Sequence, residues 1–206
     1  MKTVVLIGDS IRLCYQQRVT ELLGDNVRVL APEVNCRFTK YALWGMFNWM
    51  ECWGSPKPDV IHRNTGIWDL HRCTSDGQVF TPLPEYLEHN RRLAEQMESY
   101  CKNLIWATIT PGGRQLDEQK KTNYVMNQTA PKVFLCDEQR KWNEDVSKYN
   151  SACSAMLAAR GIIINDLYSL VKDNTDEYIC EDGIHPSAAG VEIMAEKTAK
   201  IIKTLL

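Results

Sequence analysis

The sequence predicts an α/β protein built in three layers, with helices on both faces of a parallel sheet. Two observations favour this class. Short apolar runs of strand length recur between longer segments of helical periodicity, and this alternation is typical of βαβ units. The chain also has 206 residues, 44% of them hydrophobic, which is enough to bury a sizeable core. We therefore expect one domain over residues 1–206.

Five strands and five helices account for most of the chain. The expected strands are Thr3–Ile7, Val27–Leu30, Asp59–Arg63, Asn103–Ile109 and Gly161–Asn165. The expected helices are Arg12–Leu23, Lys40–Cys52, Pro84–Tyr100, Gln139–Arg160 and Ser187–Leu205. Prolines and glycines support these limits, because Pro82 precedes the third helix, Gly161 follows the fourth and Pro186 begins the fifth. Two longer loops remain, at about residues 68–82 and 110–138, and such loops are usually lids or binding loops, or else disordered.

The charge pattern excludes some partners. The net charge is -2, and the basic residues are scattered, so nothing indicates nucleic-acid binding. No apolar stretch approaches the roughly 18–20 residues of a membrane span. The first residues run directly into a strand rather than a signal peptide, and the eight cysteines form no C-x-x-C pair. We therefore expect a cytoplasmic protein with free, mostly buried thiols and a small ligand, whereas the oligomeric state stays open.

Polar residues follow several of the expected strands. Ligands of doubly wound sheets bind beyond the carboxyl ends of the strands. Ser10 follows the first strand, Asn35 and Arg37 follow the second, and residues 64–69 follow the third. His185 lies in the loop before the last helix. We expect these residues to converge on one edge of the sheet.

Ser10 has two interpretations. A serine between a strand and a helix is a good N-cap, since its hydroxyl accepts from an exposed backbone N–H. Alternatively, Ser10 is a nucleophile at the positive end of a helix, where its own N–H helps to bind an oxyanion. The second interpretation requires a base.

The run Asp182-Gly183-Ile184-His185-Pro186 offers that base. A carboxylate three residues before an imidazole can accept from one ring nitrogen, so that the other nitrogen takes a proton from serine. The alternative is a surface turn in which Asp182 caps the final helix and His185 has no role.

Together, the G-D-S of residues 8–10 and the D-x-x-H-P of residues 182–186 resemble the SGNH or GDSL hydrolase family. Their order and their separation by nearly the whole chain match that family. The resemblance implies the SGNH hydrolase fold, a flavodoxin-like doubly wound sheet of about five parallel strands. It also implies a nucleophile at Ser10, a base at His185 and an orienting acid at Asp182, with no cofactor.

The chain departs from the family where the oxyanion hole is expected. The second block lacks the usual glycine, which leaves a backbone N–H near Asn35 to Arg37 as the expected donor. Arg37 is otherwise a holder of an anionic or hydroxylated substrate group, or a solvated charge. The third block reads Asn64-Thr65-Gly66-Ile67-Trp68-Asp69, and literal alignment puts Trp68 at the place of the family's asparagine. We favour Asn64 over Trp68 as the donor, with Asp69 and Asp9 as structural acids.

Two rival uses of these residues are weaker. Asp69, His71 and Cys73 alternate in one loop, but no second pair at ligand spacing completes a metal site. Tryptophans can stack on sugar rings, yet most of the six are expected in the core, and only Trp68 has a site-based reason for exposure.

The expected activity is that of a serine esterase acting through an acyl-enzyme on a small ester, first of all an O-acetylated carbohydrate. A lysophospholipase, a thioesterase or an acyltransferase would use the same triad. A non-catalytic carbohydrate-binding relative, with an oxyanion hole lost from the altered blocks, is the alternative from another class.

Overall fold

The computed structural model describes residues 1–73, 75–114, 116, 134–135 and 138–206. Its main sheet has five parallel strands in the order β2-β1-β3-β5-β7. These are β1 (Lys2–Gly8), β2 (Val27–Leu30), β3 (Val60–Asn64), β5 (Leu104–Ala107) and β7 (Ile163–Asn165). This order is that of flavodoxin-like doubly wound sheets. The predicted three-layer α/β/α fold is confirmed.

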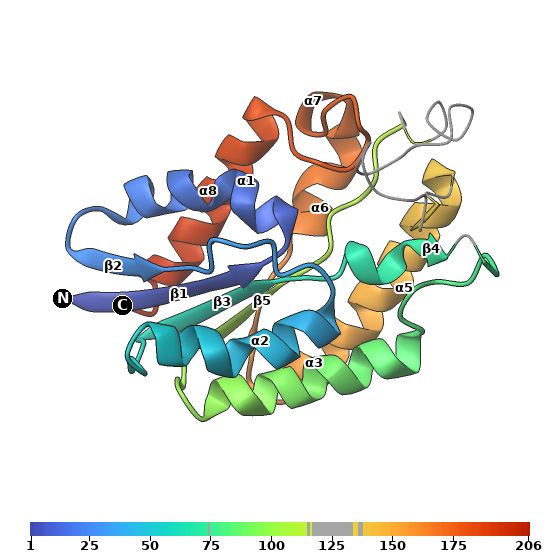
Figure 1. Cartoon of the computed structure of the whole chain (residues 1–206). Coiled ribbons are helices and arrows are strands. Elements are labelled where there is room, and N and C mark those ends of the chain that lie inside the picture. The colour runs from blue at the N-terminus through green and yellow to red at the C-terminus, as the bar shows by residue number, and fades with distance from the viewer. Residues whose placement is uncertain (74, 115, 117–133, 136–137) are drawn as a thin grey trace.

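Helices cover both faces of the sheet (Figure 1). On one face, α1 packs against α8, and on the other α2, α3 and α5 pack in sequence. The long helices are α1 (Ser10–Leu23), α2 (Thr39–Cys52), α3 (Leu83–Glu98), α5 (Gln139–Ala158) and α8 (Ala188–Lys203). Each begins and ends close to its predicted limits.

The core lies between these layers. The four residues from Val4 to Ile7 in β1 are fully buried, and so are Val60 and Ile61 in β3. Such a strand is covered on both faces, which explains its continuous apolar sequence. Each fully buried aliphatic side chain contributes about 1.5–3 kcal/mol, so β1 and β3 form a rigid support for the loops that follow them.

The short elements were not predicted. They are the 3₁₀ turns η1 (Trp68–Leu70) and η2 (Lys172–Asn174), the helices α6 (Leu167–Val171) and α7 (Thr175–Tyr178), and the antiparallel strands β4 (Arg72–Cys73) and β6 (Phe134–Leu135). Most of the predicted loop at residues 110–138 lies outside the described residues. The expected strand to Ile109 stops at Ala107, because the Ile109 backbone instead exchanges hydrogen bonds with the Asn150 amide.

Two further sequence expectations concern thiols and membranes. The seven described cysteines are all free, but only three of them are buried, so the expectation of mostly buried thiols was too strong. None of the helices in the described part of the chain combines the length and the apolar character needed to span a bilayer.

Candidate active site

Ser10 stands at the junction of β1 and α1. Asp9, not Ser10, caps the helix, since its Oδ1 accepts the N–H of Ile11 at 3.0 Å. The interpretation of Ser10 as the cap was therefore wrong. The junction is tight, because a Cβ on Gly8 would lie 2.4 Å from the Cβ of Arg12, and only glycine fits there. With its neighbour capping the helix, the Ser10 hydroxyl is available to another partner.

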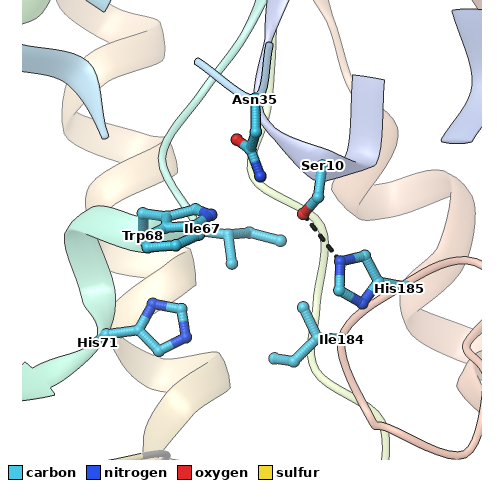
Figure 2. A pocket seen from close by; sticks show the side chains of 7 residues that line it. All are labelled: Ser10, Asn35, Ile67, Trp68, His71, Ile184 and His185. Carbon is cyan, nitrogen blue, oxygen red and sulfur yellow. Dashed lines mark hydrogen bonds between the residues drawn. The ribbon is translucent and has the colours of Figure 1, made fainter. Parts of the chain in front are cut away.

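That partner is His185. The Oγ of Ser10 lies 2.8 Å from Nε2 of His185, and Figure 2 shows the two side chains meeting at one side of a pocket. His185 Nδ1 lies 2.5 Å from Oδ2 of Asp182. An unbroken chain of hydrogen bonds thus runs from serine through imidazole to carboxylate.

A tight turn holds the acid and the imidazole together. Oδ1 of Asp182 accepts the backbone N–H groups of Ile184 and His185, both at 2.8 Å. Gly183, which follows Asp182 in this turn, has a φ of +75°, a conformation that a residue with a side chain rarely adopts. Ser187 caps α8 by accepting from Gly190, so the alternative in which Asp182 caps that helix was wrong.

The two titratable groups shift each other's pKa. Burial opposes ionisation of Asp182, but hydrogen bonds from the His185 ring and from two backbone N–H groups outweigh it and lower the pKa to about 2. The same side-chain hydrogen bond raises the pKa of His185 above its ordinary value, although burial acts against this. His185 is therefore a stronger base than a free histidine.

The loop after β2 brings an amide to Ser10. The N–H of Arg37 donates to Oδ1 of Asn35 at 2.8 Å, and the N–H of Cys36 donates to the Gly8 carbonyl at 3.1 Å. Those two backbone donors, expected to face an oxyanion, are thus engaged elsewhere. The side-chain NH₂ of Asn35 instead faces the pocket beside Ser10 (Figure 2).

Arg12 holds that loop in place, a role that the sequence did not reveal. Its guanidinium is fully buried and donates to the carbonyls of Gly8, Pro32 and Val34 at 2.9–3.1 Å. The guanidinium thus joins the end of β1 to two carbonyls of the loop and fixes the path of the loop next to Ser10. The one available signal was an arginine in the first turn of a helix, and that pattern is usually a solvated charge.

Seven side chains line a cavity of about 170 Å³ around the serine: Ser10, Asn35, Ile67, Trp68, His71, Ile184 and His185. The wall facing His185 is apolar and aromatic. His71 in this wall contacts Trp68 and Trp142 edge to face, with ring centroids 5.9 and 5.4 Å apart. Burial lowers the pKa of His71 to about 4, so its ring is neutral at pH 7.

Two predicted binding residues do not line this cavity. Asn64 is buried in β3 beside Gly8, and its carbonyl accepts the N–H of Asp9 at 2.9 Å. Arg37 is exposed, with its guanidinium 5.5 Å from the centre of the Tyr41 ring. Of the residues predicted after the second and third strands, Asn35 and Trp68 reach the cavity, whereas Asn64 and Arg37 do not.

Asp9 and Asp69 are buried and serve the backbone. Asp9 also hydrogen-bonds with the backbone of Ile67, and burial raises its pKa to about 7. Asp69 accepts the N–H of Thr39 at 2.9 Å and its hydroxyl at 2.7 Å, which ties η1 to the start of α2. Across the described ranges, no three His, Cys, Asp or Glu side chains are grouped to hold a metal, and Asp69 turns toward Thr39.

Sequence comparisons link the chain to known proteins. Residues 55–198 match the family model described as GDSL-like lipase/acylhydrolase. A spore germination lipase, LipC, from Bacillus licheniformis is 30% identical over 89 residues, which cover 41% of this chain and 39% of the lipase. The GDSL esterase/lipase CPRD49 from Arabidopsis thaliana is 27% identical over 126 residues, covering 59% of this chain and 45% of the relative. The chain thus matches less than half the length of these relatives.

Solved structures share the fold. A GDSL-like lipase from Bacteroides thetaiotaomicron superposes with a TM-score of 0.70 at 14% identity, covering 100% of this chain and 89% of the other. An acetylxylan esterase from Geobacillus stearothermophilus also has a TM-score of 0.70, at 18% identity and with coverage of 98% and 94%. The family match spans well over half of the chain, and we conclude that the protein belongs to the GDSL-like lipase/acylhydrolase family.

Proposed function

We propose that the protein is a serine esterase in which Ser10 is the nucleophile, His185 the general base and Asp182 the orienting acid. The observation that carries the proposal is the chain of hydrogen bonds at 2.8 and 2.5 Å from Ser10 through His185 to Asp182. Membership of a lipase and acylhydrolase family supports it.

The reaction proceeds in two acyl transfers. Ser10 Oγ attacks the ester carbonyl while His185 Nε2 takes the hydroxyl proton, and the resulting imidazolium is stabilised by Asp182. His185 then gives the proton to the leaving alcohol as the carbon–oxygen ester bond breaks. A water molecule, deprotonated by the same nitrogen, attacks the acyl-serine and releases the acid. This chemistry requires neither metal nor organic cofactor.

Two donors bind the oxyanion in this proposal. The Ser10 N–H lies in the first turn of α1 and donates to no acceptor among the described residues. The NH₂ of Asn35 faces the same space. A preorganised donor of this kind contributes about 3–4 kcal/mol to the transition state, and the positive end of the helix adds to it.

The size of the cavity favours a short acyl group. A volume of about 170 Å³, walled by Ile67, Ile184 and His71, is below the roughly 300–1,000 Å³ of drug-sized pockets. An acetyl group fits such a space, whereas a long acyl chain does not. Solved structures with this fold include acetylxylan esterases, which is consistent with an O-acetylated carbohydrate as substrate. A lysophospholipase, thioesterase or acyltransferase remains the runner-up.

A series of aryl esters tests the proposal. We expect the wild type to hydrolyse acetyl esters fastest, with kcat/KM falling as the acyl chain lengthens to octanoyl. Ser10→Ala and His185→Ala should each lower kcat by about 10⁴-fold or more. A rate that rises from acetyl to octanoyl would contradict the acetylesterase, and a Ser10→Ala rate equal to that of the wild type would contradict the esterase itself.

A further inference from the structure

Trp44 is exposed, although the sequence analysis expected most of the tryptophans in the core. Its side chain is 66% exposed on α2, whereas Trp106 and Trp142 are buried. It ends a row of ring contacts: Phe80 to Phe38 at 4.9 Å, Phe38 to Tyr41 at 6.1 Å and Tyr41 to Trp44 at 5.6 Å between centroids. We call Phe80, Phe38, Tyr41 and Trp44 the aromatic row.

The aromatic row starts next to segments that carry lining residues of the active-site cavity. The N–H of Phe80 donates to the carbonyl of His71 at 2.6 Å, and His71 lines the cavity. Phe38 follows Asn35, another lining residue, by three positions. All rings of the row are at least partly exposed. The row therefore runs from the segments that hold His71 and Asn35 along the first turns of α2.

Cations accompany the aromatic row. Arg37 lies over the Tyr41 ring, and Lys40 and Arg92 line a groove of about 530 Å³ beside Trp44, between α2 and α3. None of these three cations makes an ion pair with another described residue. These three charges are therefore open to a ligand that approaches along the exposed rings.

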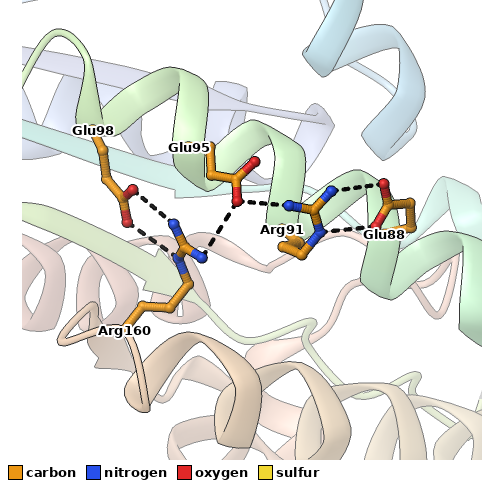
Figure 3. Close-up of polar contacts among 5 residues, drawn as sticks. All are labelled: Glu88, Arg91, Glu95, Glu98 and Arg160. Atoms are coloured by element: carbon orange, nitrogen blue, oxygen red, sulfur yellow. Dashed lines mark hydrogen bonds and ion pairs between the residues drawn. The ribbon is translucent and has the colours of Figure 1, made fainter.

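The acid in the groove is already neutralised. Glu95 forms ion pairs with Arg91 at 2.6 Å and with Arg160 at 3.5 Å, within a network that also includes Glu88 and Glu98 (Figure 3). That network engages Glu88 and Glu98 of α3 as well as Glu95. Among the charged residues that line the groove, the two that are in no ion pair with a described residue, Lys40 and Arg92, are therefore both positive.

We propose that the aromatic row and its cations bind a carbohydrate chain that carries carboxylates, with the acetylated sugar at Ser10. The inference rests on the proposed function and extends it to the substrate class. Aromatic faces stack on the apolar faces of sugar rings, and ammonium and guanidinium groups bind carboxylates by charge-assisted hydrogen bonds. Aromatic residues and arginine are also enriched at protein–protein interfaces, so the test below includes self-association as an outcome against the proposal.

Kinetics on three acetyl esters separates the row from the triad. An aryl acetate occupies the cavity alone, an acetylated xylo-oligosaccharide adds a neutral chain, and an acetylated oligogalacturonate adds a charged one. Trp44→Ala should lower kcat/KM on both oligosaccharides by about 10-fold, because the ring that stacks on the sugar is lost. The double variant Lys40→Gln/Arg92→Gln should lower kcat/KM on the oligogalacturonate only. Phe47→Ala, 54% exposed on the same helix, and Arg28→Gln, exposed on β2, are the matched controls.

Binding measurements keep this inference separate from the esterase proposal. Calorimetry with deacetylated oligogalacturonate and the Ser10→Ala protein should show binding that Trp44→Ala and the Lys40/Arg92 double variant weaken. If the wild type hydrolyses no ester yet binds the oligogalacturonate through Trp44, the carbohydrate-binding role of the row is supported and the esterase proposal is contradicted. If the wild type hydrolyses aryl acetate but the variants of the row have wild-type kcat/KM on every oligosaccharide, the carbohydrate-binding role of the row is contradicted. If light scattering shows a wild-type dimer that becomes monomeric in Trp44→Ala, the carbohydrate-binding proposal would also be overturned.

Discussion

The backbone N–H of Arg37 donates to Oδ1 of Asn35 at 2.8 Å, and this single bond sets which end of the amide faces Ser10. An N–H can only approach the amide oxygen, so the NH₂ group is left on the side of the cavity. The turn requires a φ of +50° at Arg37, which a non-glycine residue rarely adopts. The strained turn thus places the Asn35 NH₂ at the proposed oxyanion site.

Replacing Asn35 by Ala should lower kcat by about 10²–10³-fold, since one oxyanion donor is lost, while KM changes little. Steady-state hydrolysis of an aryl acetate measures both constants. Asn64→Ala is the informative comparison, because the sequence favoured Asn64 as the donor, whereas the structure buries it outside the cavity. A larger loss of kcat in Asn64→Ala than in Asn35→Ala would show that Asn64, not Asn35, is the oxyanion donor.

Arg12→Lys should lower both the free energy of unfolding and kcat. A lysine cannot reach the carbonyls of Gly8, Pro32 and Val34 together, and unsatisfied buried acceptors cost on the order of 3 kcal/mol in the free energy of unfolding. Urea denaturation measures this loss. Arg18→Lys, on an exposed face of the same helix, should change stability far less. Equal effects of the two variants would contradict a positioning role for Arg12.

The pH dependence of kcat/KM should report His185. The base must be neutral, and Asp182 raises its pKa, so activity should rise with pH along a limb centred above the ordinary value of 6.5. In Asp182→Asn the limb should move to lower pH, and kcat should fall by about 10⁴-fold because the wrong tautomer is favoured. The exposed Asp173→Asn serves as control. An unshifted limb in Asp182→Asn would argue against this pairing.

Asp9→Asn should become relatively more stable as the pH rises. Burial raises the pKa of Asp9 to about 7 from an ordinary 3.8, so between these values the folded state keeps a proton that the unfolded chain has lost. Wild-type stability therefore falls with rising pH, by at most about 1.4 kcal/mol per unit, and the amide removes this slope while still accepting from Ile11.

Free energies of unfolding at pH 5 and pH 8 provide the measurement for Asp9→Asn. Asp59→Asn is the matched control, because Lys2 and the Thr3 N–H lower the pKa of Asp59, and its effect should be constant across this range. A constant difference between Asp9→Asn and the wild type would refute the buried, protonated state of Asp9.

The sequence predicted the layers of the fold because buried parallel strands and amphipathic helices leave clear patterns. Residues 4–7 are apolar because both faces of β1 are covered, and the start of α8 follows the Pro186 signal closely. Helices of four or five residues, such as α6 and α7, are too short to show a period and depend on contacts with the rest of the protein.

The candidate site divides in the same way. Ser10 and His185 are 175 positions apart, and two short motifs with the known topology were enough to expect them together. The orientation of Asn35 and the burial of Arg12 could not be expected, because they depend on backbone groups of an irregular loop, such as the Val34 carbonyl. No periodicity records where such a loop places its hydrogen bonds.

The central claim is that His185 activates Ser10, and a fluorophosphonate probe tests it without knowledge of the substrate. We expect the native protein to be labelled once, on the peptide that contains Ser10, with labelling lost in Ser10→Ala and strongly slowed in His185→Ala, as intact-mass and peptide mass spectrometry can determine. Absence of label from the native protein, or equal labelling of Ser10→Ala, would contradict the account.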